Sequence, residues 1–116
     1  GSMTNVVFHI DEDARWEQLL SNLEYYSENF GETSKIEVVI NGAAVRSFNG
    51  FDVHPEHGRR ILALAEAGVR FAVCANSLRN RQIPEENIPV GAIEIVPQGI
   101  SELVAKQGEG FAYIKQ

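Results

Sequence analysis

Short runs of β-forming apolar residues alternate with segments of helical character along the whole chain. Five such runs have the composition of strands: residues 5–10, 35–40, 69–74, 92–96 and 111–114. Parallel strands in one sheet need a crossover connection, which is usually a helix, so this order is typical of βαβ units. We therefore predict an α/β fold in which a five-stranded, mainly parallel sheet carries helices on both faces.

The segments between the strands have apolar residues at helical spacing. In the first helical segment these residues recur every three or four positions: Trp16, Leu19, Leu20, Leu23, Tyr26 and Phe30. Pro55 suits the first position of the next helix, because its fixed φ and missing N–H cost nothing there. We predict that the buried side of this helix consists of Ile61, Leu62, Leu64 and Ala65. The last helix, residues 100–107, is predicted to turn Ile100, Leu103 and Val104 inward.

Length and charge restrict the class of protein. The chain has 116 residues, enough for one domain, which we place at residues 3–116 after a cloning scar, Gly1-Ser2. A net charge of −6 implies no basic surface, so neither nucleic acid nor an anionic membrane surface is an expected partner. No apolar run approaches the roughly 20 residues that span a bilayer. Because a single cysteine forms no internal disulfide, we expect a reducing, cytoplasmic setting.

Several motifs that would define a function are absent. The sequence has no phosphate-binding loop, no dinucleotide-binding G-x-G-x-x-G, no C-x-x-C and no nucleophile elbow. His54 and His57 lie three positions apart at a predicted helix start, but zinc needs three or four converging ligands. We therefore predict neither a metal nor another cofactor, and a metal-dependent hydrolase is the least favoured class of function.

Cys74, the only cysteine, stands where the third apolar run ends. In parallel α/β sheets, ligand and catalytic sites collect at the carboxyl ends of the strands. A thiol at that point faces the amino end of the following helix, whose unpaired N–H groups favour an anion and lower the thiol pKa. Cys74 is therefore the candidate catalytic residue. The alternative is a small buried core residue, a role that free cysteine often has.

Other polar residues are expected at the same edge of the sheet, because the carboxyl ends of parallel strands lie together. The candidate binding residues follow three of the predicted strands: His9, Asn41, Gly42, Asn76 and Ser77. A simpler role is open for two of them. In these simpler roles, His9 forms a hydrogen bond with a neighbouring loop at the end of its strand, and Asn41 is a turn residue.

Four segments of the chain together resemble one protein family: residues 7–12, 38–42, 68–78 and 108–115. In these segments the chain is similar to the DsrE/DsrF-like family of small sulfur-relay proteins, in its single-domain, mostly uncharacterised branch. The resemblance extends from Asn5 onward, and the cysteine segment is its most specific part.

The resemblance implies a three-layer α/β/α fold, assembly into homotrimers or hexamers, and a cysteine that carries sulfur as a persulfide. Cys74 would be that carrier, placed between a sulfur donor protein and an acceptor protein. Such a carrier needs one nucleophilic and accessible thiolate. Asn76 and Ser77 could then stabilise the thiolate or the outer sulfur of the persulfide, and His9 or Asn41 could add a hydrogen bond.

Two functions therefore stay open. The first is a sulfur-relay protein with a sulfurtransferase-like carrier thiol at Cys74. The second is a non-catalytic module that binds a small ligand or a protein partner in a pocket at the carboxyl edge, with the thiol as part of the lining. For either function we expect some exposed aromatic side chains to be buried between subunits: Phe48, Phe51, Phe111 and Tyr113.

Overall fold

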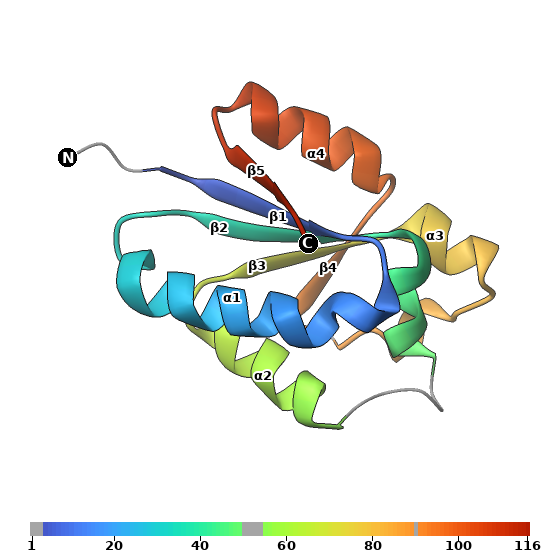
Figure 1. Ribbon diagram of the computed structural model, residues 1–116. Helices are drawn as coiled ribbons and strands as arrows, with labels where there is room; N and C mark the ends of the chain where they lie inside the picture. Colours follow the sequence, from blue (N-terminus) through green and yellow to red (C-terminus); the bar gives the residue numbers. More distant parts are fainter. Residues whose placement is uncertain (1–3, 50–54, 90) are drawn as a thin grey trace.

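The computed structural model describes residues 4–49, 55–89 and 91–116 and has a five-stranded sheet at its centre (Figure 1). The strands are β1 (Val6–Ile10), β2 (Ile36–Ile40), β3 (Arg70–Cys74), β4 (Ile93–Val96) and β5 (Ala112–Lys115). Every pair of neighbouring strands in the described sheet is parallel, and the strand order is β4-β3-β2-β1-β5. The predicted α/β fold with a five-stranded parallel sheet is confirmed.

Helices connect all the strands within the described residues. The α-helices are α1 (Trp16–Phe30), α2 (Pro55–Glu66), α3 (Ala75–Asn80) and α4 (Gly99–Gly108). Three short 3-10 helices accompany them: η1 (Asp13–Arg15), η2 (Gly42–Phe48) and η3 (Glu85–Asn87). Pro55 begins α2 as expected. None of the described helices has the length and apolar character needed to cross a membrane.

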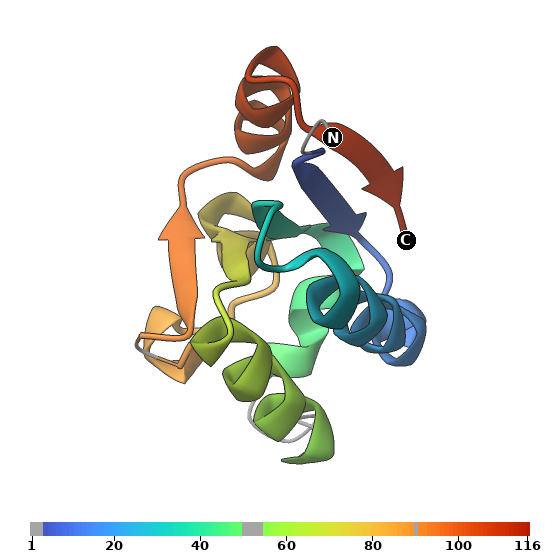
Figure 2. The ribbon, with the colours of Figure 1, turned by 90° about the vertical axis from the view of Figure 1, so that its left-hand side faces the viewer.

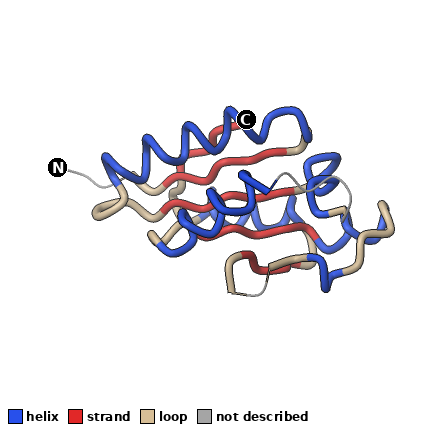
Figure 3. The backbone as a smooth tube through the Cα atoms, turned by 90° about the horizontal axis from the view of Figure 1, so that it is seen from below, coloured by secondary structure: helices blue, strands red, loops and turns tan. Residues whose placement is uncertain are grey.

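The path of the chain explains how the helices are layered. From β1 to β4 the chain advances one strand at a time, and the connection from β4 to β5 returns across the sheet. Right-handed crossovers then place α1 and α2 on one face and α4 on the other. Figures 1 and 2 show this three-layer arrangement, with α3 lying beyond the carboxyl ends of the strands. In the view from below, helices of the α1–α2 layer run along the strands (Figure 3).

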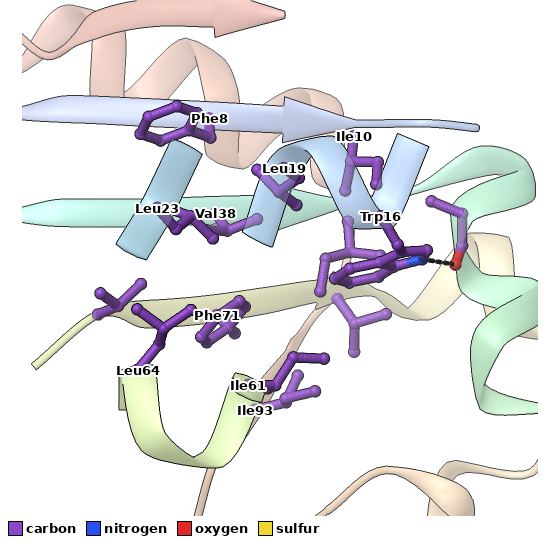
Figure 4. Packing of buried hydrophobic residues seen from close by; sticks show 14 of the residues in the cluster. Phe8, Ile10, Trp16, Leu19, Leu23, Val38, Ile61, Leu64, Phe71 and Ile93 are labelled. Carbon is purple, nitrogen blue, oxygen red and sulfur yellow. Dashed lines mark hydrogen bonds between the residues drawn. The ribbon is translucent and has the colours of Figure 1, made fainter. Parts of the chain in front are cut away.

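The larger core lies between the sheet and the α1–α2 layer (Figure 4). Alternate residues of the strands, among them Phe8, Val38 and Phe71, pack against the apolar sides of both helices. Trp16 closes one end of this core, where its indole N–H donates a hydrogen bond to the Ala44 carbonyl at 3.0 Å. Leu62 is exposed rather than inward, because the inward positions of α2 are taken by its neighbours one residue before and two residues after.

The opposite face of the sheet has a much smaller apolar cluster. In the described part of the chain, α4 is the only helix on this face, and its cluster consists of Val7, Val39, Leu103 and Phe111. One helix over five strands leaves room for few apolar contacts. Ile100 and Val104, which were expected to point inward, are therefore 60% and 65% exposed.

The alternation of side chains puts polar residues on this second face: His9, Glu37, Arg70, Cys74 and Glu94. The face under α4 is thus where the chemistry-bearing residues of the sheet gather. Two of the aromatic residues expected at the surface, Phe48 and Phe111, are instead buried in the two clusters. Tyr113 is 41% exposed, and Phe51 lies outside the described residues.

Candidate functional site

Cys74 is the last residue of β3 and the N-cap of α3, so it joins a strand to a helix. Its sulfur accepts a hydrogen bond from the backbone N–H of Ser77 at 3.4 Å, in the way that a serine or aspartate side chain usually caps a helix. The residue is 3% exposed. The thiol therefore lies at the carboxyl edge of the sheet, as predicted, but it is buried from solvent.

The surroundings of the thiol act on its pKa in opposite directions. Burial raises the pKa of the Cys74 thiol, because the charged thiolate is disfavoured away from water. Hydrogen bonds from the Ser77 hydroxyl and from the backbone N–H groups of Gly99, Ser77 and Asn76 lower it, and their combined effect is the larger. The pKa of Cys74 is therefore below its ordinary value, so the buried site favours a thiolate.

Ser77 is oriented toward the sulfur by the end of β2. The backbone N–H of Gly42 donates a hydrogen bond to the Ser77 hydroxyl oxygen at 2.9 Å. With its oxygen engaged as an acceptor, the hydroxyl keeps its proton free for the sulfur of Cys74. Gly42 has φ +56°, and a Cβ there would lie 3.1 Å from the Asp11 carbonyl oxygen, so glycine suits this turn.

His9 forms a second polar group on the same face. Its Nε2 lies 2.8 Å from the Asn41 side-chain oxygen, and its Nδ1 lies 2.6 Å from the Tyr113 hydroxyl. Because the Asn41 oxygen can only accept, Nε2 carries a proton and donates it, while Nδ1 pairs with the Tyr113 hydroxyl. Both nitrogens of the buried imidazole are thus paired, and the three side chains join β1, β5 and the end of β2.

Gly99, the first residue of α4, lies between the two groups. A Cβ on Gly99 would be 3.2 Å from the Cβ of Asn41 and 3.3 Å from a methyl carbon of Val39. Only a residue without a side chain lets the amino end of α4 come this close to the sheet. The close approach brings the Gly99 N–H onto the sulfur of Cys74.

The structure thus brings the predicted site residues together in two connected groups. Gly42, Ser77 and Asn76 surround Cys74, with Asn76 acting through its backbone N–H while its side chain accepts from Arg79. His9 and Asn41 bond each other, and Asn41 lies beside the Gly99 backbone, where an added Cβ would come within 3.2 Å of it.

From the sequence, Gly99 is expected at the carboxyl edge of the sheet without being a candidate site residue, and Tyr113 is not singled out as a member of the site. Gly99 follows a proline-marked break after the fourth strand, at the same edge of the sheet, and this position was a usable signal. For Tyr113, the alternation within the last strand puts it on the same face as His9.

Charged side chains gather at the opposite, amino edge of the same face. Glu37 is 2% exposed, and Arg70 donates to it at 2.9 Å. Burial, and next the hydrogen bond and charge of Glu102, raise the pKa of Glu37 to about 8, so it is protonated at neutral pH. A cavity of about 680 Å³ opens here, lined in part by Lys35, Arg70 and Lys106.

Metal ligands do not converge within residues 4–49, 55–89 and 91–116, where no three His, Cys, Asp or Glu side chains form a group. Of the histidine pair noted in the sequence, His57 lies 3.1 Å from a carboxylate oxygen of Glu17 on α1. His54 lies outside the described residues.

Comparisons with known proteins agree with this architecture. The model of the DsrE/DsrF-like family matches residues 6–115. The structure of a protein of unknown function from Methanobacterium thermoautotrophicum superposes with a TM-score of 0.83 and 32% identity, over 97% of this chain and 99% of that one. A conserved protein of unknown function from Bacteroides thetaiotaomicron, 18% identical, shares the fold with a TM-score of 0.73, over 97% of this chain and 95% of that one. No curated protein matches the chain significantly.

Proposed function

Because the chain belongs to the DsrE/DsrF-like family, we propose that it is a sulfur-relay protein whose Cys74 carries sulfane sulfur as a persulfide. The observation that carries the proposal is the set of hydrogen-bond donors on the Cys74 sulfur, which lowers the thiol pKa in spite of burial. A structural cysteine in an apolar core has no need of such donors, and its pKa is raised rather than lowered.

The proposed chemistry needs one thiolate and no cofactor. The Cys74 thiolate attacks the outer sulfur of a donor persulfide, so that a new S–S bond forms at Cys74 as the donor S–S bond breaks. The donor leaves as a thiolate with the electron pair of the broken bond, and no external oxidant is consumed. An acceptor thiolate then takes the outer sulfur by the same exchange, which regenerates the Cys74 thiolate.

Intact-mass measurement after exposure to a sulfane-sulfur donor tests this proposal. We expect a reducible addition of about 32 Da per sulfur in the wild-type protein. The Cys74→Ser variant, which keeps the shape of the site, should fold normally and gain no such mass. Equal sulfur loading of both proteins, or none in the wild type, would contradict the proposal.

The low exposure of Cys74 favours one alternative, a non-catalytic module that binds a small ligand or a protein partner at the carboxyl edge of the sheet. In that case the thiol is only part of the lining. Slow alkylation of Cys74 at neutral pH, together with no sulfur adduct, would support this alternative over the relay function.

We also propose that the protein works in the cytoplasm, where its single cysteine stays reduced, and that it assembles into homotrimers or hexamers. Exposed apolar side chains support self-association: Ile100 and Val104 lie one turn apart on α4, and Ile114 lies on the edge strand β5. Sedimentation at micromolar concentration should show an oligomer that Ile100→Lys weakens and Leu62→Lys, on the opposite layer, does not. A monomeric wild type would contradict this assembly.

A further inference from the structure

Arg70 ties the sheet to α4 on the face that holds Cys74. One guanidinium nitrogen, Nη1, donates both to Glu37 on β2 at 2.9 Å and to Glu102 on α4 at 3.2 Å. The other side of the guanidinium is held by Glu94 of β4, at 3.1 and 2.7 Å. Arg70 is therefore fixed from the sheet and presents one nitrogen to the helix.

Glu37 adds a second link to the same helix. Among the described residues no donor reaches its buried Oε2, whereas its Oε1 accepts from Arg70. The Glu102 carboxyl on α4 nevertheless acts on Glu37, whose pKa it raises together with the larger effect of burial. Lys106, one turn further along α4, lies 3.8 Å from Glu37 Oε1. We call Glu37, Arg70 and Glu102 the α4 anchor.

The α4 anchor lies one turn from the residue that touches the thiol. Glu102 follows Gly99 by three positions, and its backbone N–H bonds the Gln98 carbonyl at the start of the same helix. α4 has ten residues and buries few apolar side chains on the sheet, mainly Leu103. With so small an apolar contact, the polar links of the anchor supply much of what fixes the helix in place.

We infer that the α4 anchor is a positioning device that holds the Gly99 N–H on the sulfur of Cys74. Docked in this way, α4 both favours the thiolate and covers it, which accounts for a thiol that is activated and yet 3% exposed. Release of the anchor lets α4 shift enough to take the Gly99 N–H off the sulfur while the thiol stays covered, so the thiol loses one of its donors. The meaning of this device for sulfur transfer rests on the proposed function, whereas the position of Gly99 does not.

Alkylation of Cys74 as a function of pH tests the inference in the full-length chain. The rate follows the thiolate fraction, so the midpoint of its pH profile reports the thiol pKa. In Glu102→Ala a negative charge is lost, and this loss by itself favours the thiolate and lowers the midpoint. If the anchor positions Gly99, the midpoint rises instead, and alkylation at neutral pH is about three-fold slower. The loss of charge and the loss of Gly99 positioning therefore predict shifts of the midpoint in opposite directions.

Two further variants serve as controls. Glu102→Gln loses the same charge but keeps an oxygen that can accept from Arg70, so its midpoint should lie at or below that of the wild type. Glu109→Ala removes a charge from the far end of α4, where the carboxylate contacts only Lys106 among its described ion pairs, and should not raise the midpoint. An unchanged or lowered midpoint in folded Glu102→Ala would overturn the inference.

A milder change covers the case in which Glu102→Ala does not fold. Arg70→Lys keeps the positive charge, but a single ammonium does not reproduce the planar fork that serves three carboxyl groups. We expect faster hydrogen exchange of the Gly99 amide and a raised midpoint in this variant. Wild-type values for both would overturn the inference. Sulfur loading is measured separately, so a failure of the relay function leaves this test unaffected.

Discussion

The backbone N–H of Gly42 donates to the hydroxyl of Ser77 at 2.9 Å, and the same hydroxyl bonds the sulfur of Cys74. The turn after β2 therefore acts on a thiol at the end of β3 through a single oxygen. The Ser77 side chain therefore has a role in the site, because its hydroxyl links the Gly42 N–H to the sulfur of Cys74. This link also gives the first test of how the site is activated.

Ser77→Ala should make Cys74 less reactive at neutral pH. The hydroxyl bond to the sulfur is lost, so the thiol pKa rises and the thiolate fraction falls. The Gly42 N–H also loses its acceptor, which should lower the free energy of unfolding by about 1 kcal/mol. Alkylation rates and urea unfolding measure the two effects. Ser101→Ala, an exposed change on α4, should alter neither, and a wild-type rate in Ser77→Ala would contradict the role of the hydroxyl.

Gly99→Ala should both destabilise the protein and weaken thiol activation. The new methyl group would lie 3.2 Å from Asn41, which is held by its hydrogen bond with His9, and 3.3 Å from the buried Val39, so we expect α4 to shift at a cost of about 1–3 kcal/mol. Gly108→Ala is the matched control at the other end of α4, where a Cβ meets nothing within 4 Å. That change should be neutral or slightly stabilising. Thermal unfolding compares them, and equal effects would show that Gly99 does not fix the approach of α4.

Glu37 should make the protein less stable as the pH rises from about 5 to about 8. Its native pKa is raised to about 8, first by burial, whereas the unfolded carboxyl titrates near its ordinary 4.5. In this window the unfolded chain has lost a proton that the native state keeps, so the free energy of unfolding falls with pH and levels off above it. The pKa of Glu102 is lowered, chiefly by its hydrogen bond with Glu37. The contribution of Glu102 to the pH dependence of stability therefore falls at a lower pH than that of Glu37.

Glu37→Gln isolates that contribution, because the amide donates a hydrogen bond but does not titrate. We expect the variant to gain stability relative to the wild type as the pH rises toward 8. Urea unfolding of both proteins at several pH values gives this difference, in which contributions common to the two proteins cancel. A difference that does not change with pH would mean that Glu37 is ionised in the native state at neutral pH.

Tyr113→Phe should cost about 0.5–1.5 kcal/mol of stability, because the Nδ1 of the buried His9 loses its only hydrogen-bond partner in the described structure. Tyr25→Phe is the comparison, since the ring of Tyr25 is well exposed. Chemical denaturation measures both. Equal, negligible effects would mean that water replaces the Tyr113 hydroxyl without loss.

The arrangement of the strands was predictable because their signal is local. Runs such as 36–40 and 70–74 show their character in five residues, and the handedness of crossovers then settles the faces of the sheet. The edge that collects Cys74, Asn41 and Gly42 follows from the same rule. The positions of these residues can be predicted from the strands alone, without knowing how the side chains pack.

The orientation of α4 and the α4 anchor were not predictable in this way. Ile100 and Val104 have the spacing of an inward face, but one helix over five strands buries only what lies directly beneath it. The link between Arg70 and Glu102 joins residues 32 positions apart, and it depends on where α4 comes to rest. Glu37 offered a partial signal as the single charge within the run 36–40.

The most direct test of the site is the pH profile of Cys74 alkylation in the native protein, compared with the same chain unfolded in urea. The donors on the sulfur predict a lower midpoint in the native protein, although burial by itself would raise it. A native midpoint equal to or above that of the unfolded chain would contradict an activated thiol, and Cys74 would then be a core residue.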